Sequence, residues 1–255
     1  MTKPQAIERF HLALLQVLPQ HVPAANYAIK GGANLRLFLG SIRRSEDIDL
    51  NFVGRAGTSW SLQARMDAVL RSPALTSLLA VQGMKILSVN PSKVTATTGR
   101  WKFQMTAPGL EVSSKVEFSM RGEDRPLYQM GPVLARIASA AGMRPAIANH
   151  YLPLGAIEQK VAALALRSET QVRDVFDLDF LFVRFPDLAM MAQASAGNLD
   201  LARKRVFEAT YADYLQLVVR FLDPAFVQMY HNKPEWERIV LNVATRLDAM
   251  RARTR

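Results

Sequence analysis

Two short motifs lie close together in the first fifth of the chain, one with a pair of glycines and one with a pair of aspartates. In the first, Lys30-Gly31-Gly32, a glycine pair follows a short apolar stretch and precedes a helical pattern. Backbone N–H groups at such a turn can bind phosphate. In the second, Asp47 and Asp49 lie two residues apart in an alternating strand pattern, so both carboxylates point to one face, where they can hold a divalent metal. Together, these features predict a site for a nucleoside triphosphate.

The elements that must position these motifs follow from the apolar pattern. Helical spacing covers residues 4–18 and 59–71, and a short helix over residues 33–39 is expected before Gly40. Short strands are expected on either side of that helix and, further along, between Pro- and Gly-containing breakers: residues 27–29, 48–53, 86–89, 94–97, 101–105 and 115–118. Residues 54–57 are expected to form a turn, and residues 123–145 are turn-rich. This half predicts a mixed sheet extended by antiparallel strands.

The second half of the chain is helical in pattern. Apolar stripes recur in five segments, which predict a four- or five-helix bundle: residues 153–167, 172–184, 199–208, 211–222 and 234–251. The expected fold class is therefore α/β (α+β), with two domains. Residues 1–148 form the mixed-sheet domain with the candidate catalytic motifs, and residues 149–255 form the helical domain.

The two motifs resemble a known signature. Lys30-Gly31-Gly32 with Arg43-x-Ser45-Glu46-Asp47-Ile48-Asp49-Leu50 is similar to the AbiEii/AbiGii-type nucleotidyltransferase toxins, a branch of the DNA polymerase β-like nucleotidyltransferase superfamily that includes the MenT toxins. The similarity continues in the helical half, at residues 158–164 and at Arg173-Asp174-x-x-Asp177-Leu178. It therefore spans residues 30–178.

The resemblance implies a fold, a reaction and a partner. The fold would be a nucleotidyltransferase-like mixed β-sheet with a C-terminal helical bundle that completes the nucleotide site. The protein would be the toxin of a toxin–antitoxin system with an antitoxin encoded nearby. It would transfer a nucleotide from an NTP to an RNA acceptor, with the tRNA 3′ end favoured, and release pyrophosphate. Mg²⁺ or Mn²⁺ would be held by Asp47, Asp49 and Glu117, although Glu111 and Glu123 compete for the third position.

The same resemblance assigns roles around the nucleotide. Lys160 would reach the triphosphate, Asp174 would orient that lysine or the nucleotide, and Asp177 would hold the helix pair together. The expected nucleotide-binding residues are Lys30, Gly31, Gly32, Ser45 and Lys160, and the expected catalytic residues are Asp47, Asp49, Glu117, Lys160 and Asp174. Gly40-Ser41 is a competing glycine-serine pair close to Asp47, with Ser41 as a contributor.

Composition constrains the partners. The 255 residues include 32 basic and 22 acidic side chains, a formal charge of +10, which favours a polyanion such as RNA. We expect six basic residues to lie near the active edge of the sheet and to contact the RNA backbone: Arg36, Arg43, Arg44, Arg100, Lys102 and Arg121. The absence of cysteine excludes disulfides, thiolate zinc sites and a cysteine nucleophile. Without a long apolar segment, we expect a cytoplasmic protein with no membrane partner.

Two other functions compete with this interpretation. One is a catalytically silent RNA-binding or regulatory protein of the same fold. The presence of both aspartates, Lys160 and Asp174 argues against it. The other is a small-molecule nucleotidyltransferase that modifies an antibiotic hydroxyl. The positive charge favours RNA over such a substrate.

Overall fold

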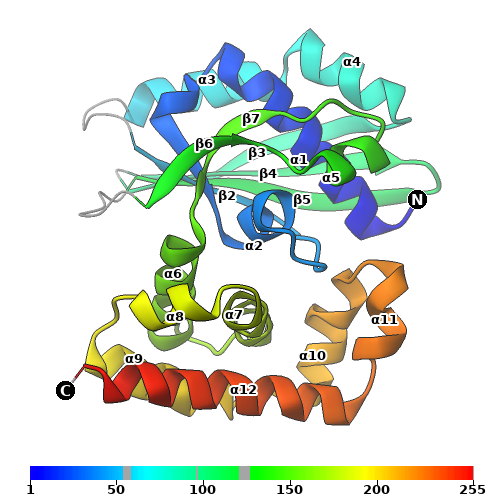
Figure 1. The fold of residues 1–255 in the computed structure, drawn as a ribbon. Coiled ribbons are helices and arrows are strands. Elements are labelled where there is room, and N and C mark those ends of the chain that lie inside the picture. The colour runs from blue at the N-terminus through cyan, green and yellow to red at the C-terminus, as the bar shows by residue number, and fades with distance from the viewer. Residues whose placement is uncertain (54–58, 96, 121–126, 255) are drawn as a thin grey trace. The chain divides into compact units, whose positions relative to one another are not determined.

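The computed structural model describes residues 1–53, 59–95, 97–120 and 127–254, which form two compact units (Figure 1). The first unit comprises Met1–Gly40 and Arg44–Tyr151, and the second comprises Ser41–Arg43 and Leu152–Arg255. A three-residue segment from the N-terminal half of the sequence thus belongs to the helical unit. The turn expected at residues 54–57, together with Arg121 and Glu123, lies outside the described residues.

A mixed sheet forms the centre of the first unit. Its described strands follow the order β3-β4-β5-β2-β1-β7-β6. The pairs β2/β5 and β1/β7 are parallel, and the other neighbours are antiparallel. In chain order the strands are β1 (Tyr27–Lys30), β2 (Ile48–Phe52), β3 (Lys85–Val94), β4 (Thr98–Ala107), β5 (Leu110–Ser119), β6 (Tyr128–Pro132) and β7 (Ile147–Tyr151).

Helices cover one face of this sheet (Figure 1). The alternation of apolar and polar residues along the strands explains which face is covered. In strand β4, Trp101 and Phe103 are buried against the helices, while Lys102 points to the opposite face and is exposed. The indole Nε1 of Trp101 donates a hydrogen bond to Asp67 of helix α3. The helical segments of this unit are α1 (Lys3–Val17), η1 (Leu18–Gln20), η2 (Ala24–Asn26), α2 (Gly31–Asn34), η3 (Leu35–Leu39), α3 (Ser59–Leu70), α4 (Pro73–Val81) and α5 (Ala135–Ala140).

The sequence pattern missed part of this unit. We expected a break at Asn90-Pro91-Ser92 and a separate strand over residues 94–97, but β3 continues through Val94. Proline is tolerated there because β3 is the edge strand, and the register shifts beside Pro91. The short elements α4, β6, α5 and β7 were not predicted. Each of these elements has few residues, so its apolar residues show little periodicity that could be recognised in the sequence.

The second unit is a helical bundle in which α6, α7, α9 and α12 pack on one another. The five helical segments expected from the sequence are all present, although the segment over residues 211–222 is divided between α10 and η4. The segments of this unit are α6 (Pro153–Leu166), α7 (Val172–Arg184), α8 (Pro186–Met191), α9 (Ala196–Val206), α10 (Tyr211–Leu217), η4 (Val219–Phe221), α11 (Pro224–Tyr230) and α12 (Lys233–Ala252). The fold class expected from the sequence is confirmed.

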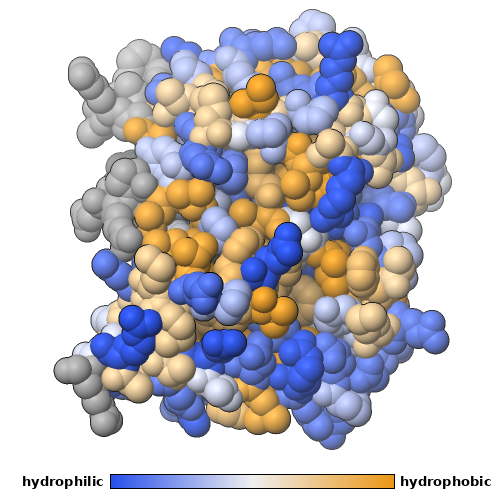
Figure 2. Space-filling model, viewed as in Figure 1, coloured by the Kyte–Doolittle hydropathy of each residue, from blue (hydrophilic) through white to orange (hydrophobic). Residues whose placement is uncertain are grey.

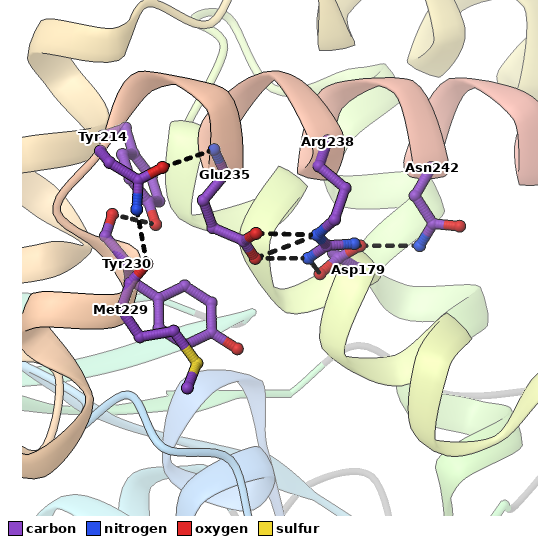
Figure 3. Close-up of polar contacts among 8 residues, drawn as sticks. Asp179, Tyr214, Met229, Tyr230, Glu235, Arg238 and Asn242 are labelled. Atoms are coloured by element: carbon purple, nitrogen blue, oxygen red, sulfur yellow. Dashed lines mark hydrogen bonds and ion pairs between the residues drawn. The ribbon is translucent and has the colours of Figure 1, made fainter.

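An ionic cluster joins α7 to α12 (Figure 3). Arg238 Nη2 donates to Asp179 Oδ2 at 2.9 Å, and Asn242 donates to the other oxygen of Asp179 at 2.7 Å. Glu235 also accepts from Arg238, one turn away on α12. Because the Arg238 side chain is 44% exposed, each of its ion pairs contributes modestly to stability.

Hydrophilic and apolar residues are interspersed on the surface of both units in the view of Figure 2. Within the described part of the chain, no helix has the length and apolar character needed to cross a membrane.

Candidate active site

The polar face of the sheet aligns charged side chains in a row across four strands. Asp49 of β2 lies opposite Lys30 of β1 and beside Glu117 of β5. Glu117 in turn lies opposite Arg100 of β4. The alternation of β2 explains this placement, since Ile48 is buried in the core and Asp49 therefore points to the opposite face.

Three carboxylates interact at this row, those of Asp47, Asp49 and Glu117, which we call the acidic trio, and basic side chains lie beside them. Burial raises the pKa of Asp49, and the negative charges of Asp47 and Glu117 raise it further against the opposing effect of nearby lysines. Lys115 Nζ lies 3.1 Å from Asp47 Oδ2. Arg100 Nε donates to Glu117 Oε2 at 2.6 Å. Asp49 is thus held in a position where its ionised form is disfavoured.

The acidic trio fits a divalent cation in its oxygen donors and in its charge. Carboxylates are the ligands that Mg²⁺ and Mn²⁺ prefer, and a bound cation would offset the repulsion that raises the pKa of Asp49. Among the described residues, no group of three or more His, Cys, Asp or Glu is already arranged as a set of metal ligands. Lys115 and Arg100 are the present counter-ions of Asp47 and Glu117.

The glycine turn lies against Asp49. Gly31 has φ +64°, and a Cβ at this position would lie 3.2 Å from Asp49 Oδ2. Both the left-handed backbone and the close approach require glycine. Nearby, the Ser45 hydroxyl donates to the main-chain oxygen of Asp47 at 2.8 Å and so fixes the chain just before β2. The pair Gly40-Ser41, the alternative to Gly31-Gly32, makes contacts that stabilise the local fold. Gly40 ends η3, and Ser41 Oγ accepts a hydrogen bond from the Arg43 N–H.

The helical unit holds a buried ionic network built around Lys160. Its ammonium lies 2.6 Å from Asp174 Oδ1 and 2.6 Å from Asp177 Oδ2. Arg43 donates to Asp177 through Nε and Nη2. Arg167 Nε lies 3.2 Å from the second oxygen of Asp174. Since Lys160 is on α6 and both aspartates are on α7, the contact of Asp177 with Lys160 joins the helix pair, as the sequence predicted.

The charges of this network decide the ionisation of Asp177. Burial by itself would raise its pKa, but Arg43 and Lys160 outweigh that effect and hold the pKa at about 2. The same contacts fix the segment Ser41–Arg43, where the Ile42 carbonyl also accepts from Asp223 N–H and Arg43 pairs with Leu222 in a β-bridge. The segment Ser41–Arg43 is therefore anchored in the helical unit.

The other two arginines predicted to bind RNA are also buried. Arg36 and Arg44 both form ion pairs with Glu8 of α1, which is the partner that sequence reasoning missed. Arg36, Arg43 and Arg44 are 4%, 4% and 8% exposed. A buried, ion-paired guanidinium is poorly placed to contact a phosphate backbone. By contrast, Lys102 is exposed and Arg100 is half-buried on the polar face of the sheet.

Comparisons with known proteins show that solved structures share this fold. The fold is similar to the crystal structure of JHP933 from Helicobacter pylori, at 18% identity and a TM-score of 0.60 over 99% of this chain and 94% of that chain. It is also similar to a structure described as a "putative nucleotidyltransferase" from H. pylori, at 19% identity and a TM-score of 0.58 over 99% and 97% of the two chains. Comparison with curated proteins found no significant match.

A family match identifies the chain as a nucleotidyltransferase. The model of the family described as nucleotidyl transferase AbiEii toxin, Type IV TA system, matches residues 13–249. This chain belongs to that family of toxin–antitoxin nucleotidyltransferases, and the family resemblance found in the sequence is confirmed. Membership implies an NTP substrate and an antitoxin partner.

Proposed function

We propose that this protein transfers a nucleotide from an NTP to RNA, with the tRNA 3′ end as the favoured acceptor, and that the reaction depends on Mg²⁺ or Mn²⁺. The observation that carries the proposal is the register of Asp49 beside Glu117, with Asp47 two residues earlier and the Gly31 turn in contact with Asp49. This grouping combines a cation-binding set with a backbone turn suited to phosphate. The formal charge of +10 supports a polyanionic acceptor.

In the proposed reaction, an RNA hydroxyl attacks the α-phosphorus of the NTP. A new oxygen–phosphorus bond forms, the α–β phosphoanhydride bond breaks, and pyrophosphate leaves. Glu117 accepts the hydroxyl proton. Asp47, Asp49 and Glu117 would hold the divalent metal, whose chemistry is to stabilise charge on the attacking and leaving oxygens. Lys115 and Arg100, which pair with Asp47 and Glu117 in this structure, would then be available to phosphate oxygens.

We further propose that Lys160 contacts the triphosphate and that Asp174 orients this lysine or the nucleotide. In the helical unit Lys160 is bonded to two carboxylates, so contact with a triphosphate requires exchange of one anionic partner for another. Lys160→Ala should weaken binding of a non-hydrolysable NTP by about 1.5–3 kcal/mol, the range for a hydrogen bond to a charged group. Calorimetric titration measures this, and unchanged affinity would remove Lys160 from the donor site.

The proposed function is tested by incubating the protein with Mg²⁺, each labelled NTP in turn and total RNA. Wild type should label RNA, and Asp47→Ala and Asp49→Ala should abolish labelling while circular dichroism stays unchanged. The matched control is Asp67→Ala, an aspartate that bonds to Trp101 on the covered face of the sheet. Labelled RNA from either active-site variant at the wild-type rate would refute the assignment. Transfer to a small hydroxyl compound alone would identify the small-molecule alternative.

A further inference from the structure

A groove opens beside the acidic trio on the polar face of the sheet. It has a volume of about 520 Å³ and begins at Asp47 and Lys115. From there it extends over β5 and β4 to the edge strand β3. Its lining residues are Asp47, Ser88, Asn90, Lys102, Phe103, Gln104, Ser113, Ser114 and Lys115. We call it the β3–β5 groove.

The β3 and β4 part of this face is basic, whereas the acidic residues of the face lie on β5 and at β2. Strands β3 and β4 together contain Lys85, Lys93, Arg100 and Lys102 and no acidic residue. The sheet register places Lys93 opposite Arg100, and Lys85 opposite Thr106, so these basic side chains lie on the same face as the groove. All three lysines are exposed. Such a face attracts a phosphate backbone.

Neutral hydrogen-bonding groups fill the space between the lysines. Gln104 lies opposite Ser88 of β3 and Ser113 of β5, and Asn90 lies opposite Lys102. Amide side chains offer both donors and acceptors, which suits base edges and ribose hydroxyls. The aromatic ring in the lining belongs to Phe103, which is 1% exposed and has no free face for stacking. The groove is therefore suited to hydrogen bonding and charge, rather than to base stacking.

The strand order separates this groove from the glycine turn. Gly31 follows β1, on one side of β2, whereas β5, β4 and β3 continue the sheet on the other side of β2. The acids on β2 and β5 stand between the two. In an in-line displacement the attacking and leaving oxygens lie on opposite sides of the phosphorus. If the leaving pyrophosphate is at the glycine turn, the attacking hydroxyl approaches from the groove.

We propose that the β3–β5 groove binds the single-stranded 3′ end of the RNA acceptor, with its terminal hydroxyl at the Asp47 end. The proposal rests on the RNA-directed transfer proposed above. Lys85, Lys93 and Lys102 contact phosphates along the strand, while Asn90 and Gln104 contact sugar or base edges. The surface that receives the acceptor is thus the face of the antiparallel strands on which Lys85, Lys93 and Lys102 are exposed.

The first test measures RNA binding without catalysis. The triple variant Lys85→Gln, Lys93→Gln and Lys102→Gln is compared with a control of equal charge change, Arg71→Gln, Lys204→Gln and Lys233→Gln, whose side chains are exposed outside the groove. Filter binding of total tRNA at several salt concentrations gives the slope of log affinity against log salt. Three lost contacts to a single strand should flatten this slope by about two units, since each contributes about 0.7.

A second test uses the absence of cysteine from the chain. Gln104→Cys introduces a unique thiol in the groove, and Arg71→Cys introduces an exposed one directly after helix α3, outside the groove. RNA with a thiol-reactive group at its 3′-terminal nucleotide should cross-link several times faster to the first variant than to the second. The readout requires neither metal nor NTP.

The outcomes separate this proposal from the proposed function. The groove assignment is overturned if the lysine variant keeps the wild-type salt slope, if the control variant flattens it equally, if wild type binds no RNA, or if the two thiols react equally. Flattening confined to the lysine variant together with preferential cross-linking supports it. If wild type binds RNA through the groove but labels no RNA with any NTP, the transfer reaction is wrong and the binding surface stands.

Discussion

Replacing Asp177 with asparagine should destabilise the helical unit strongly, because it removes the buried negative charge shared by Arg43 and Lys160 and one of the two oxygens that accept from them. Asp177 is fully buried, and its oxygens lie 2.7 Å from Arg43 Nη2 and 2.6 Å from Lys160 Nζ. The difference between the ordinary pKa of 3.8 and about 2 corresponds to roughly 2.4 kcal/mol of preference for the ionised form. Arg43 and Lys160 each lose a buried anionic partner as well, so we expect a loss of about 3–5 kcal/mol.

Asp179→Asn is the matched control, since it makes the same chemical change two residues along the same helix. The partner of Asp179 is Arg238, which is 44% exposed and keeps Glu235, so we expect a loss of about 1 kcal/mol or less (Figure 3). Urea unfolding at pH 7, followed by circular dichroism, should show a midpoint lower by about 1–2 M for Asp177→Asn. Equal losses in the two variants, or a loss below about 1 kcal/mol for Asp177→Asn, would refute the reasoning.

The pH dependence of this effect gives an independent check. The folded-state pKa of Asp177 lies below its unfolded value, so its stabilisation is complete above the unfolded pKa of 3.8 and disappears as the pH falls through about 2. The stability difference between wild type and Asp177→Asn should therefore be constant from pH 7 to 5 and shrink below pH 4. A difference that grows on acidification contradicts the network described here.

Three further predictions concern the sheet. Asp49→Asn should raise the melting temperature in metal-free buffer at pH 7, because the raised pKa of Asp49 means that its ionisation destabilises the fold. The difference from wild type should shrink as the pH falls and Asp49 becomes protonated. A lower melting temperature of the variant at pH 7 would count against this. Gly31→Ala should lower both stability and nucleotide transfer more than Gly142→Ala, which has a similar positive φ but no atom near the added Cβ; equal effects would show that the approach to Asp49 is unimportant. Glu117→Gln should reduce transfer by about 10²-fold or more, whereas Glu111→Gln should not; the reverse result would move the third carboxylate to Glu111.

The sequence alone was enough to predict the family, through the N-terminal motifs, and the type of most elements. Residues two positions apart in a strand point to the same face, so the spacing of Asp47 and Asp49 predicts that both carboxylates share a face. The apolar residues Ile48 and Leu50 mark the opposite face as the buried one, so this prediction needs only local sequence. The longer helices of the second half carry several turns of apolar periodicity and were predicted for the same reason. Short elements such as β7 give little local signal, although β7 lies within the sheet beside β1.

Tertiary structure decided which charges meet. Arg36, Arg43 and Arg44 looked like free basic residues near the site, yet their partners are Glu8, on α1, and Asp177, 134 residues away from Arg43 in the chain. No local pattern encodes such pairs, because ion pairs form between surfaces that come together only when the core packs. The register of Asp49 beside Glu117 is of the same kind, since it depends on the parallel pairing of strands that are distant in sequence.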